Sequence, residues 1–274
     1  DARAGASSRL LLDAHAVACL CERLAVLGTI LPPGQRIDSF SSTMPEDKKD
    51  RYGQFISAKP GMNSFWWSMN YPVGEKMTDT DFHERPAGPL ALPGVYSARL
   101  TVGEWSMEQN FNLIKDPRVK TSQRDLKAQF ELMIAIQNKL NEIVVGVNTS
   151  RAVKARITDW TNRLAGNEDA AKVIAACTRL AKKFDKVESE LVQKELTSFG
   201  DVLNYREKLF EKLSGLPPVV RSADSKPTQQ SHDVFDKLSG QADKQLASLQ
   251  ALVEGDLAKI NSQLSDLGVE IISG

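Results

Sequence analysis

Two stretches decide the fold that this sequence predicts: KPGMNSFWWSMNYP at residues 59–72 and GPLALPGVYSARLTV at residues 88–102. Each contains a turn dipeptide, Pro60-Gly61 in the first and Pro93-Gly94 in the second, and an alternating strand follows each turn. A long polar connection, residues 71–92, joins them. Its length favours either a ligand-facing loop or plain flexibility.

The strand after the first turn has one apolar face. Because side chains alternate along a strand, Phe65, Trp67 and Met69 fall on one face, and Trp66 falls on the other. We therefore expect the first three in a core and Trp66 outside it.

The second strand is followed by a predicted hairpin. Its inward residues are expected to be Tyr96, Ala98, Leu100 and Val102. The link Gly103-Glu104 suits a type II′ turn, whose first position needs a positive φ, and residues 105–114 return with Phe111 and Leu113 inward. Strands of this number and spacing predict a small antiparallel Ig-like β-sandwich over residues 36–117.

Residues 1–35 differ in composition and periodicity from the rest of the chain. Apolar residues recur there with a weak helical period that ends at Leu31-Pro32-Pro33-Gly34, which predicts an atypical N-terminal segment with a short helix. A strand is expected at residues 36–41.

The sequence predicts helices over residues 118–274. Ser122 can cap the first of them. Apolar residues then recur at spacings of three, four and seven in several stripes: Leu126, Phe130, Met133, Leu140, Val144 and Val147; Val153, Ile157, Trp160 and Leu164; Val173, Cys177, Leu180, Phe184, Val187 and Leu191; Leu203, Leu209, Phe210 and Leu213; and a last one from Phe235 to Leu267. Such stripes are satisfied by packing together, so the predicted fold class is α+β, a sandwich followed by an antiparallel α-helical bundle.

Charge and composition give no sign of a nucleic-acid or membrane partner. The chain of 274 residues has 35 basic and 35 acidic side chains, a formal net charge of zero. The basic residues between Arg151 and Lys186 have no aromatic residues interleaved with them, which favours a solvated helix face over nucleic-acid binding. The most apolar stretch, residues 14–31, is interrupted by Glu22 and Arg23 and is too short for a membrane span.

The two strand motifs carry a resemblance to a known family. KPGMNSFWWSMNYP, followed by Gly88-Pro89 and by Pro93-Gly94-Val95-Tyr96, resembles the C-terminal region of bacterial proteins with sortilin-type or Asp-box (BNR) β-propellers, often labelled glycosyl hydrolases. The β part is also similar to the Ig-like domain of the flagellar hook-capping protein. The resemblance extends from about residue 36 to the end, although Ser68 stands where that family often has Asp.

The resemblance implies a non-catalytic C-terminal interaction or structural module of a secreted or cell-envelope protein. The implied partner is an upstream β-propeller in cis, with a protein or a glycan as a further partner. Two alternatives stay open: an accessory part of a sialidase-like glycoside hydrolase, and a carbohydrate-binding module.

Candidate contact and metal-binding residues are few. Trp66, Trp105 and Tyr71 are the aromatic residues placed to contact a ligand or partner, although large aromatics equally cover neighbouring domains. Asp79, Asp81 and Glu84 form the one acidic cluster in a loop and offer oxygen ligands to Ca²⁺, but lack the rest of an EF-hand pattern.

No nucleotide, zinc or nucleophile motif appears in the sequence, and we expect neither a cofactor nor a catalytic site. Cys177 lies on an apolar stripe, and we expect it to pack in a core.

Overall fold

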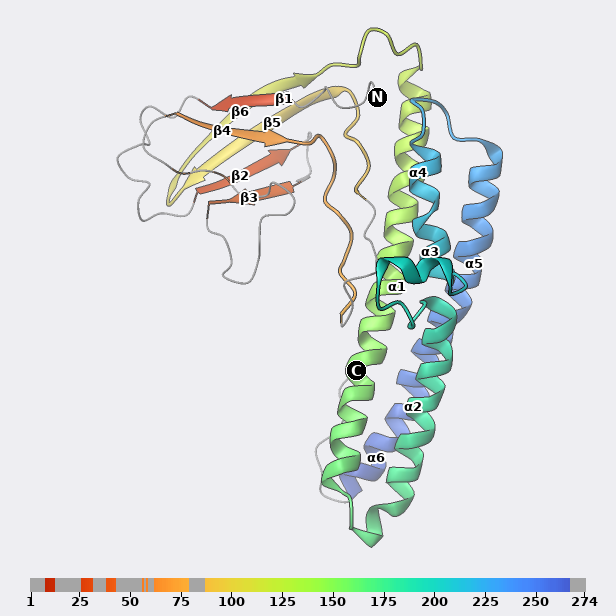
Figure 1. The fold of residues 1–274 in the computed structure, drawn as a ribbon. Coiled ribbons are helices and arrows are strands. Elements are labelled where there is room, and N and C mark those ends of the chain that lie inside the picture. Colours follow the sequence, from red (N-terminus) through yellow and green to blue (C-terminus); the bar gives the residue numbers. More distant parts are fainter. Residues whose placement is uncertain are drawn as a thin grey trace. The chain divides into compact units, whose positions relative to one another are not determined.

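The computed structural model describes residues 8–12, 26–31, 38–42, 56, 58, 62–78 and 87–266. Figure 1 shows the strands and helices that these residues form. The chain divides into two compact units. One comprises residues 1–72 and 87–130, and the other residues 73–86 and 131–274. Most of the strands belong to the first unit and most of the helices to the second.

The first unit is built on antiparallel strands. Their bounds are β1 Ser8–Leu12, β2 Val26–Leu31, β3 Asp38–Ser41, β4 Asn63–Trp67, β5 Gly94–Val102 and β6 Trp105–Leu113. One sheet has the order β3-β2-β5-β6, and β1 pairs with β4 in a separate two-stranded sheet. Gly103, the first residue of the β5–β6 turn, has a φ of 59°, as the predicted turn requires.

The core of this unit gathers aromatic residues from three strands. Trp67 of β4 is 2% exposed, and its ring centroid lies 5.9 Å from that of Tyr96 and 6.2 Å from that of Phe111. Along β5 the predicted inward residues are buried: Tyr96, Ala98, Leu100 and Val102. The alternation in the sequence therefore identified the inner face of β5 correctly.

The prediction of an Ig-like β-sandwich followed by a bundle is wrong. The described residues form one four-stranded sheet and a two-stranded pair, whereas an Ig sandwich packs two larger sheets with about seven strands in all. Residues 8–12 and 26–31, in the segment predicted to hold a short helix, are strands. They pair with β4 and with β5, and partners so distant in sequence leave no local signal.

Helices make up most of the chain after residue 122. Their bounds are α1 Gln123–Arg163, η1 Glu168–Ala170, α2 Ala171–Leu191, η2 Phe199–Leu203, α3 Leu209–Ser214, α4 Leu216–Val220, α5 Gln229–Ala251, η3 Leu252–Leu257 and α6 Ala258–Asp266. At the start of α1, the Asp125 N–H donates to Ser122 Oγ over 3.2 Å, the cap expected from the sequence. The turn η3 is π-helical and connects α5 to α6.

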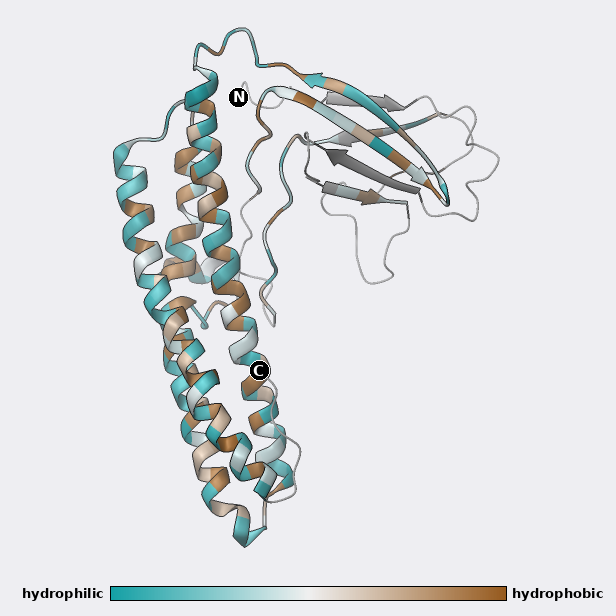
Figure 2. Ribbon diagram, turned by 180° about the vertical axis from the view of Figure 1, so that it is seen from behind, coloured by the Kyte–Doolittle hydropathy of each residue, from teal (hydrophilic) through white to brown (hydrophobic). Residues whose placement is uncertain are grey.

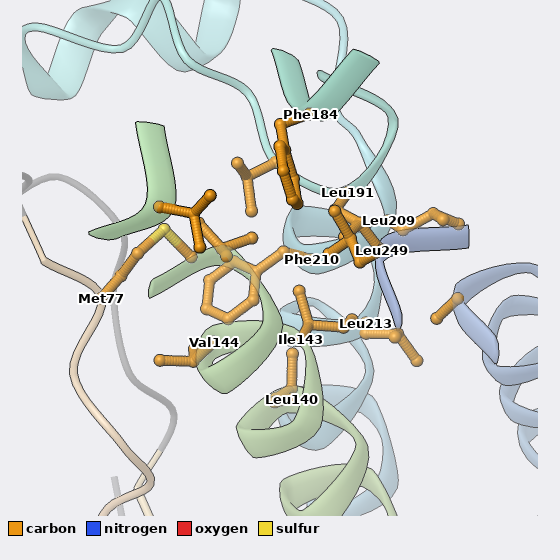
Figure 3. Packing of buried hydrophobic residues seen from close by; sticks show 14 of the residues in the cluster. Met77, Leu140, Ile143, Val144, Phe184, Leu191, Leu209, Phe210, Leu213 and Leu249 are labelled. Carbon is orange, nitrogen blue, oxygen red and sulfur yellow. The ribbon is translucent and has the colours of Figure 1, made fainter. Parts of the chain in front are cut away.

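One hydrophobic core runs through the second unit. Figure 2 shows that each helix carries both apolar and polar residues. Figure 3 shows apolar side chains from α1, α2, α3 and α5 converging, with Phe184, Ile143 and Leu213 among them. Each of these three is fully buried. Cys177 is also buried, as expected, and burial raises the pKa of its thiol.

The predicted domain division, into residues 1–35, 36–117 and 118–274, stays a prediction.

Candidate functional site

An extended segment of the chain lies along α1 in the second unit. We name residues 73–78 the strap. It contains no helix or strand, and its backbone is bound by side chains of α1. Because unpaired backbone groups are costly to bury, a segment without regular structure needs such partners wherever it packs on a core.

Two asparagines of α1 bind the strap. Asn141 Oδ1 accepts the Glu75 N–H over 2.8 Å. Asn148 Oδ1 accepts the Thr78 N–H over 2.9 Å and its hydroxyl over 3.0 Å, and Asn148 Nδ2 donates to the Lys76 carbonyl over 3.0 Å. Asn148 thus binds the main chain as both donor and acceptor, the pairing that a neighbouring β-strand would provide.

The distance between the two asparagines along α1 matches the distance between the two strap residues that they bind. Asn141 and Asn148 are seven positions apart on a helix, which is about 10.5 Å. Glu75 and Thr78 are three positions apart in an extended segment, which is about 10 Å. The higher-numbered strap residue bonds the higher-numbered helix residue, so the strap runs parallel to α1.

Met77 anchors the strap in the core. It is 3% exposed, while Glu75, Lys76 and Thr78 on either side of it are exposed. Figure 3 shows the Met77 side chain extending from the strap toward the cluster of apolar side chains. Burying one methionine contributes roughly 1.5–3 kcal/mol. The strap is therefore held by its backbone, by the buried Met77 side chain and by the Thr78 hydroxyl.

Arg151 links the strap to α2. Its guanidinium donates to the Thr78 carbonyl, and its Nε donates to Glu188 Oε1 over 2.9 Å. Glu188 is 1% exposed, and its second oxygen accepts from Lys154 Nζ over 2.6 Å. Both carboxylate oxygens of this buried acid thus have a cationic partner, which offsets much of the cost of burying the charge.

The ion pairs extend from Lys154 toward solvent. Lys154 Nζ lies 2.7 Å from Asp185 Oδ1, and Lys194 Nζ lies 3.1 Å from the same oxygen. Burial favours the neutral form of Lys154, but its bonds to Asp185 and Glu188 outweigh that and raise its pKa. Burial likewise acts against the charge of Asp185, and the two lysines outweigh it and lower the pKa.

The basic stretch from Arg151 to Lys186 was predicted to be a solvated helix face, and for its first two members that is wrong. The side chains of Arg151 and Lys154 are only 16% and 20% exposed. They are held by Glu188, which the apolar stripe of α2 gave no reason to single out.

The sequence did contain one signal for the strap site. Two asparagines, Asn141 and Asn148, lie inside a helix, where asparagine is unfavourable.

The aromatic candidates lie in the first unit. The Tyr71 ring packs edge-on against Phe130 with centroids 5.0 Å apart, and burial raises the pKa of its hydroxyl. Trp105 begins β6 and is 43% exposed. Trp66 lies in β4 opposite Arg9, and its side chain is outside the described part of the chain.

The proposed Ca²⁺ ligands Asp79, Asp81 and Glu84 lie outside the described residues. Within residues 62–78, 87–266 and the shorter described segments, no three His, Cys, Asp or Glu side chains gather as a metal site would require. No helix among the described residues has the length and apolar character to cross a membrane.

Comparisons with known proteins give no relative for this chain: no family model, no curated protein and no solved structure matches it.

Proposed function

We propose that the chain is a non-catalytic interaction module whose helical unit binds an extended peptide segment along α1. The observation that carries this proposal is the set of bonds from Asn141, Asn148 and Arg151 to the strap backbone. In this chain the bound segment is the strap itself.

The chemistry of the site sets what it would select. Bonds to backbone N–H and C=O groups are independent of side-chain identity, so they supply affinity for an extended chain of varied sequence. The buried Met77 position supplies specificity for an unbranched apolar side chain. The expected ligand is thus an extended peptide with one such anchor, flanked by residues that face solvent.

The buried charges support a structural role for the surrounding residues. Glu188 has both oxygens bonded to cations, and Arg151 divides its donors between that acid and the strap. These bonds fix the positions of the Arg151 and Lys154 side chains on α1. Through Arg151 they also join the strap backbone to Glu188 of α2 in one hydrogen-bond network.

The wider setting follows from the family resemblance alone. We propose that the chain is a C-terminal module of a propeller-bearing secreted or cell-envelope protein, with the propeller as its partner in cis and a protein or glycan as a further partner. The contacts of the described residues favour neither a glycoside hydrolase role nor glycan binding through Trp66, and we put forward neither.

The experiment must separate the site from the strap that occupies it. A tethered segment competes at a high effective concentration, so a free peptide binds the unaltered chain poorly. The full chain with Met77→Asp loosens the strap, because it places a charge in the core. We expect this variant to bind a fluorescent peptide of residues 70–80, measured by anisotropy, with its folding checked by circular dichroism.

Two matched controls make the result specific. Adding Asn148→Leu to the Met77→Asp chain removes three hydrogen bonds and should abolish binding. A peptide N-methylated at Thr78 loses one bonded N–H and should bind weakly, whereas one N-methylated at Met77, whose N–H has no partner among the described residues, should bind better. A folded Met77→Asp chain that fails to bind the unmodified peptide would refute the proposal.

A further inference from the structure

Strand β6 forms an open edge of the four-stranded sheet. The sheet order β3-β2-β5-β6 places it last, and within the described residues it pairs with β5 alone. It is nine residues long. A strand in this position presents a row of unpaired N–H and C=O groups that can accept another strand.

The open edge carries apolar side chains. Trp105 and Met107 stand opposite Val102 and Leu100 of β5, on the face that is buried in β5. They are nevertheless 43% and 42% exposed. The apolar layer of the sheet therefore continues to its edge without cover from the described residues.

The usual protection of an edge is absent from the β6 sequence. Natural edge strands are blocked by lysine, proline, bulges or short length. WSMEQNFNL has neither lysine nor proline, and its pairing with β5 runs without a bulge from Val102–Trp105 to Gly94–Leu113. Its single charged residue is Glu108, which is held on the outer face by Arg99 over 2.8 Å.

We propose that β6 pairs with β6 of a second copy of this chain, antiparallel and centred on Gln109. This pairing is the isologous arrangement of a two-fold dimer, in which the same strand is used by both partners. It is independent of peptide binding at the strap.

Hydrogen bonding limits the registers available. The two-residue turn makes Val102 and Trp105 a hydrogen-bonded pair, so the odd-numbered residues of β6 bond to β5. The even-numbered residues then direct their backbone groups to the open edge. A second β6 must pair even with even, which also keeps the apolar faces of the two copies on the same side.

The register centred on Gln109 is the one that the side chains favour. It places Trp105 opposite Leu113 and Met107 opposite Phe111 on the apolar face, using the full strand. On the other face Glu108 meets Asn110. Sliding by one step to centre on Glu108 would bring the two Glu108 carboxylates together, which is unfavourable.

The test uses charge at position 110 in the full chain, with mass measured by analytical ultracentrifugation over a wide concentration range. Asn110→Glu places a second acid opposite Glu108 of the other copy. Because the dimer is two-fold symmetric, this unfavourable pair occurs twice in the interface. Asn110→Lys places an opposite charge there instead. We expect the dimer dissociation constant to rise with Asn110→Glu and to fall with Asn110→Lys, by on the order of tenfold each.

The control is Asn112→Glu, an exposed change on the same strand that faces Ser106 of the other copy and should shift the constant much less. Circular dichroism checks that each variant folds. A chain that stays monomeric at every concentration would overturn the proposal. So would a dimer that responds to Asn110→Glu and Asn110→Lys in the same direction, or to neither.

Discussion

Arg151 and Glu188 are joined by a hydrogen bond of 2.9 Å between Nε and Oε1, and the same guanidinium donates to the carbonyl of Thr78. One side chain therefore connects α1, α2 and the strap. Arginine suits this position because its donors point in several fixed directions while its charge is permanent. The packing of the helices and the path of the strap depend on one another through this residue.

Glu188→Ala should destabilise the chain by about 3 kcal/mol, because it leaves Arg151 and Lys154 partly buried without their shared acid. Urea unfolding followed by circular dichroism measures this. Glu190→Ala is the matched control on the same helix. Its side chain is 59% exposed, and its nearest basic partner, Lys208, is 3.9 Å away, so the change should cost under about 0.5 kcal/mol. Equal losses in the two variants would show that the buried pairs contribute nothing.

The Asp185–Lys154 pair should affect stability at both ends of the pH scale. The pKa of Asp185 is lowered on folding, so its contribution is present above the unfolded value near 3.9 and is lost as pH falls through the folded value. The pKa of Lys154 is raised, so its contribution is present below about 10.4 and is lost as pH rises through the folded value.

We therefore expect Asp185→Asn to reduce the change in the free energy of unfolding with pH on the acid side. Lys154→Met should reduce it on the alkaline side. Denaturant unfolding across pH, compared with the unaltered chain, gives both differences. A pH-independent difference for Asp185→Asn would contradict the assignment.

Tyr96→Phe should remove a tyrosine transition near pH 12 from an alkaline absorbance titration. Burial, together with the nearby Tyr71, raises the pKa of Tyr96 to about 12. Its hydroxyl donates to the Leu92 carbonyl over 2.6 Å, and losing this bond should cost about 1 kcal/mol. Tyr205→Phe, at an exposed site, should leave that transition in place. If the transition survives in Tyr96→Phe, it belongs to another residue.

Two helix glycines should respond oppositely to alanine. At Gly240 a Cβ would meet nothing within 4 Å, so Gly240→Ala should stabilise the chain by about 0.5–1 kcal/mol through lower backbone entropy in the unfolded state. At Gly146 a Cβ would lie 2.8 Å from Leu246 Cδ2, so the same change should crowd the core and destabilise. Thermal unfolding compares them directly. A gain at both positions would mean that Leu246 moves aside at no cost.

The periodic parts of the fold could be predicted from the sequence. Met133, Leu140 and Val144 were placed on one apolar stripe and are buried in α1. Gly103 was assigned to a turn with positive φ and has it. These features depend on residues close in sequence, so local pattern contains them. The stripes on either side of residue 150 belong to one helix of 41 residues, because no breaker separates them.

The sheet architecture and the site could not be predicted in this way. β4 pairs with β1, more than fifty residues earlier, and nothing in residues 8–12 alternates clearly. The strap is bound largely through its backbone, and backbone bonds leave no pattern in its side chains that a sequence could reveal. Polar residues that serve a distant segment look, in sequence, like ordinary surface residues.

The π-helical turn η3 determines where the last helix can change in length. Leu249 and Leu257 are both buried although eight positions apart, which in a regular α-helix would turn them about 80° from each other. A π turn accommodates one additional residue, so the two align as residues seven apart would, within about 20°. Deleting one residue within Leu252–Leu257 would therefore keep α5 and α6 in phase, whereas a deletion elsewhere in this helix would rotate every later side chain by about 100°.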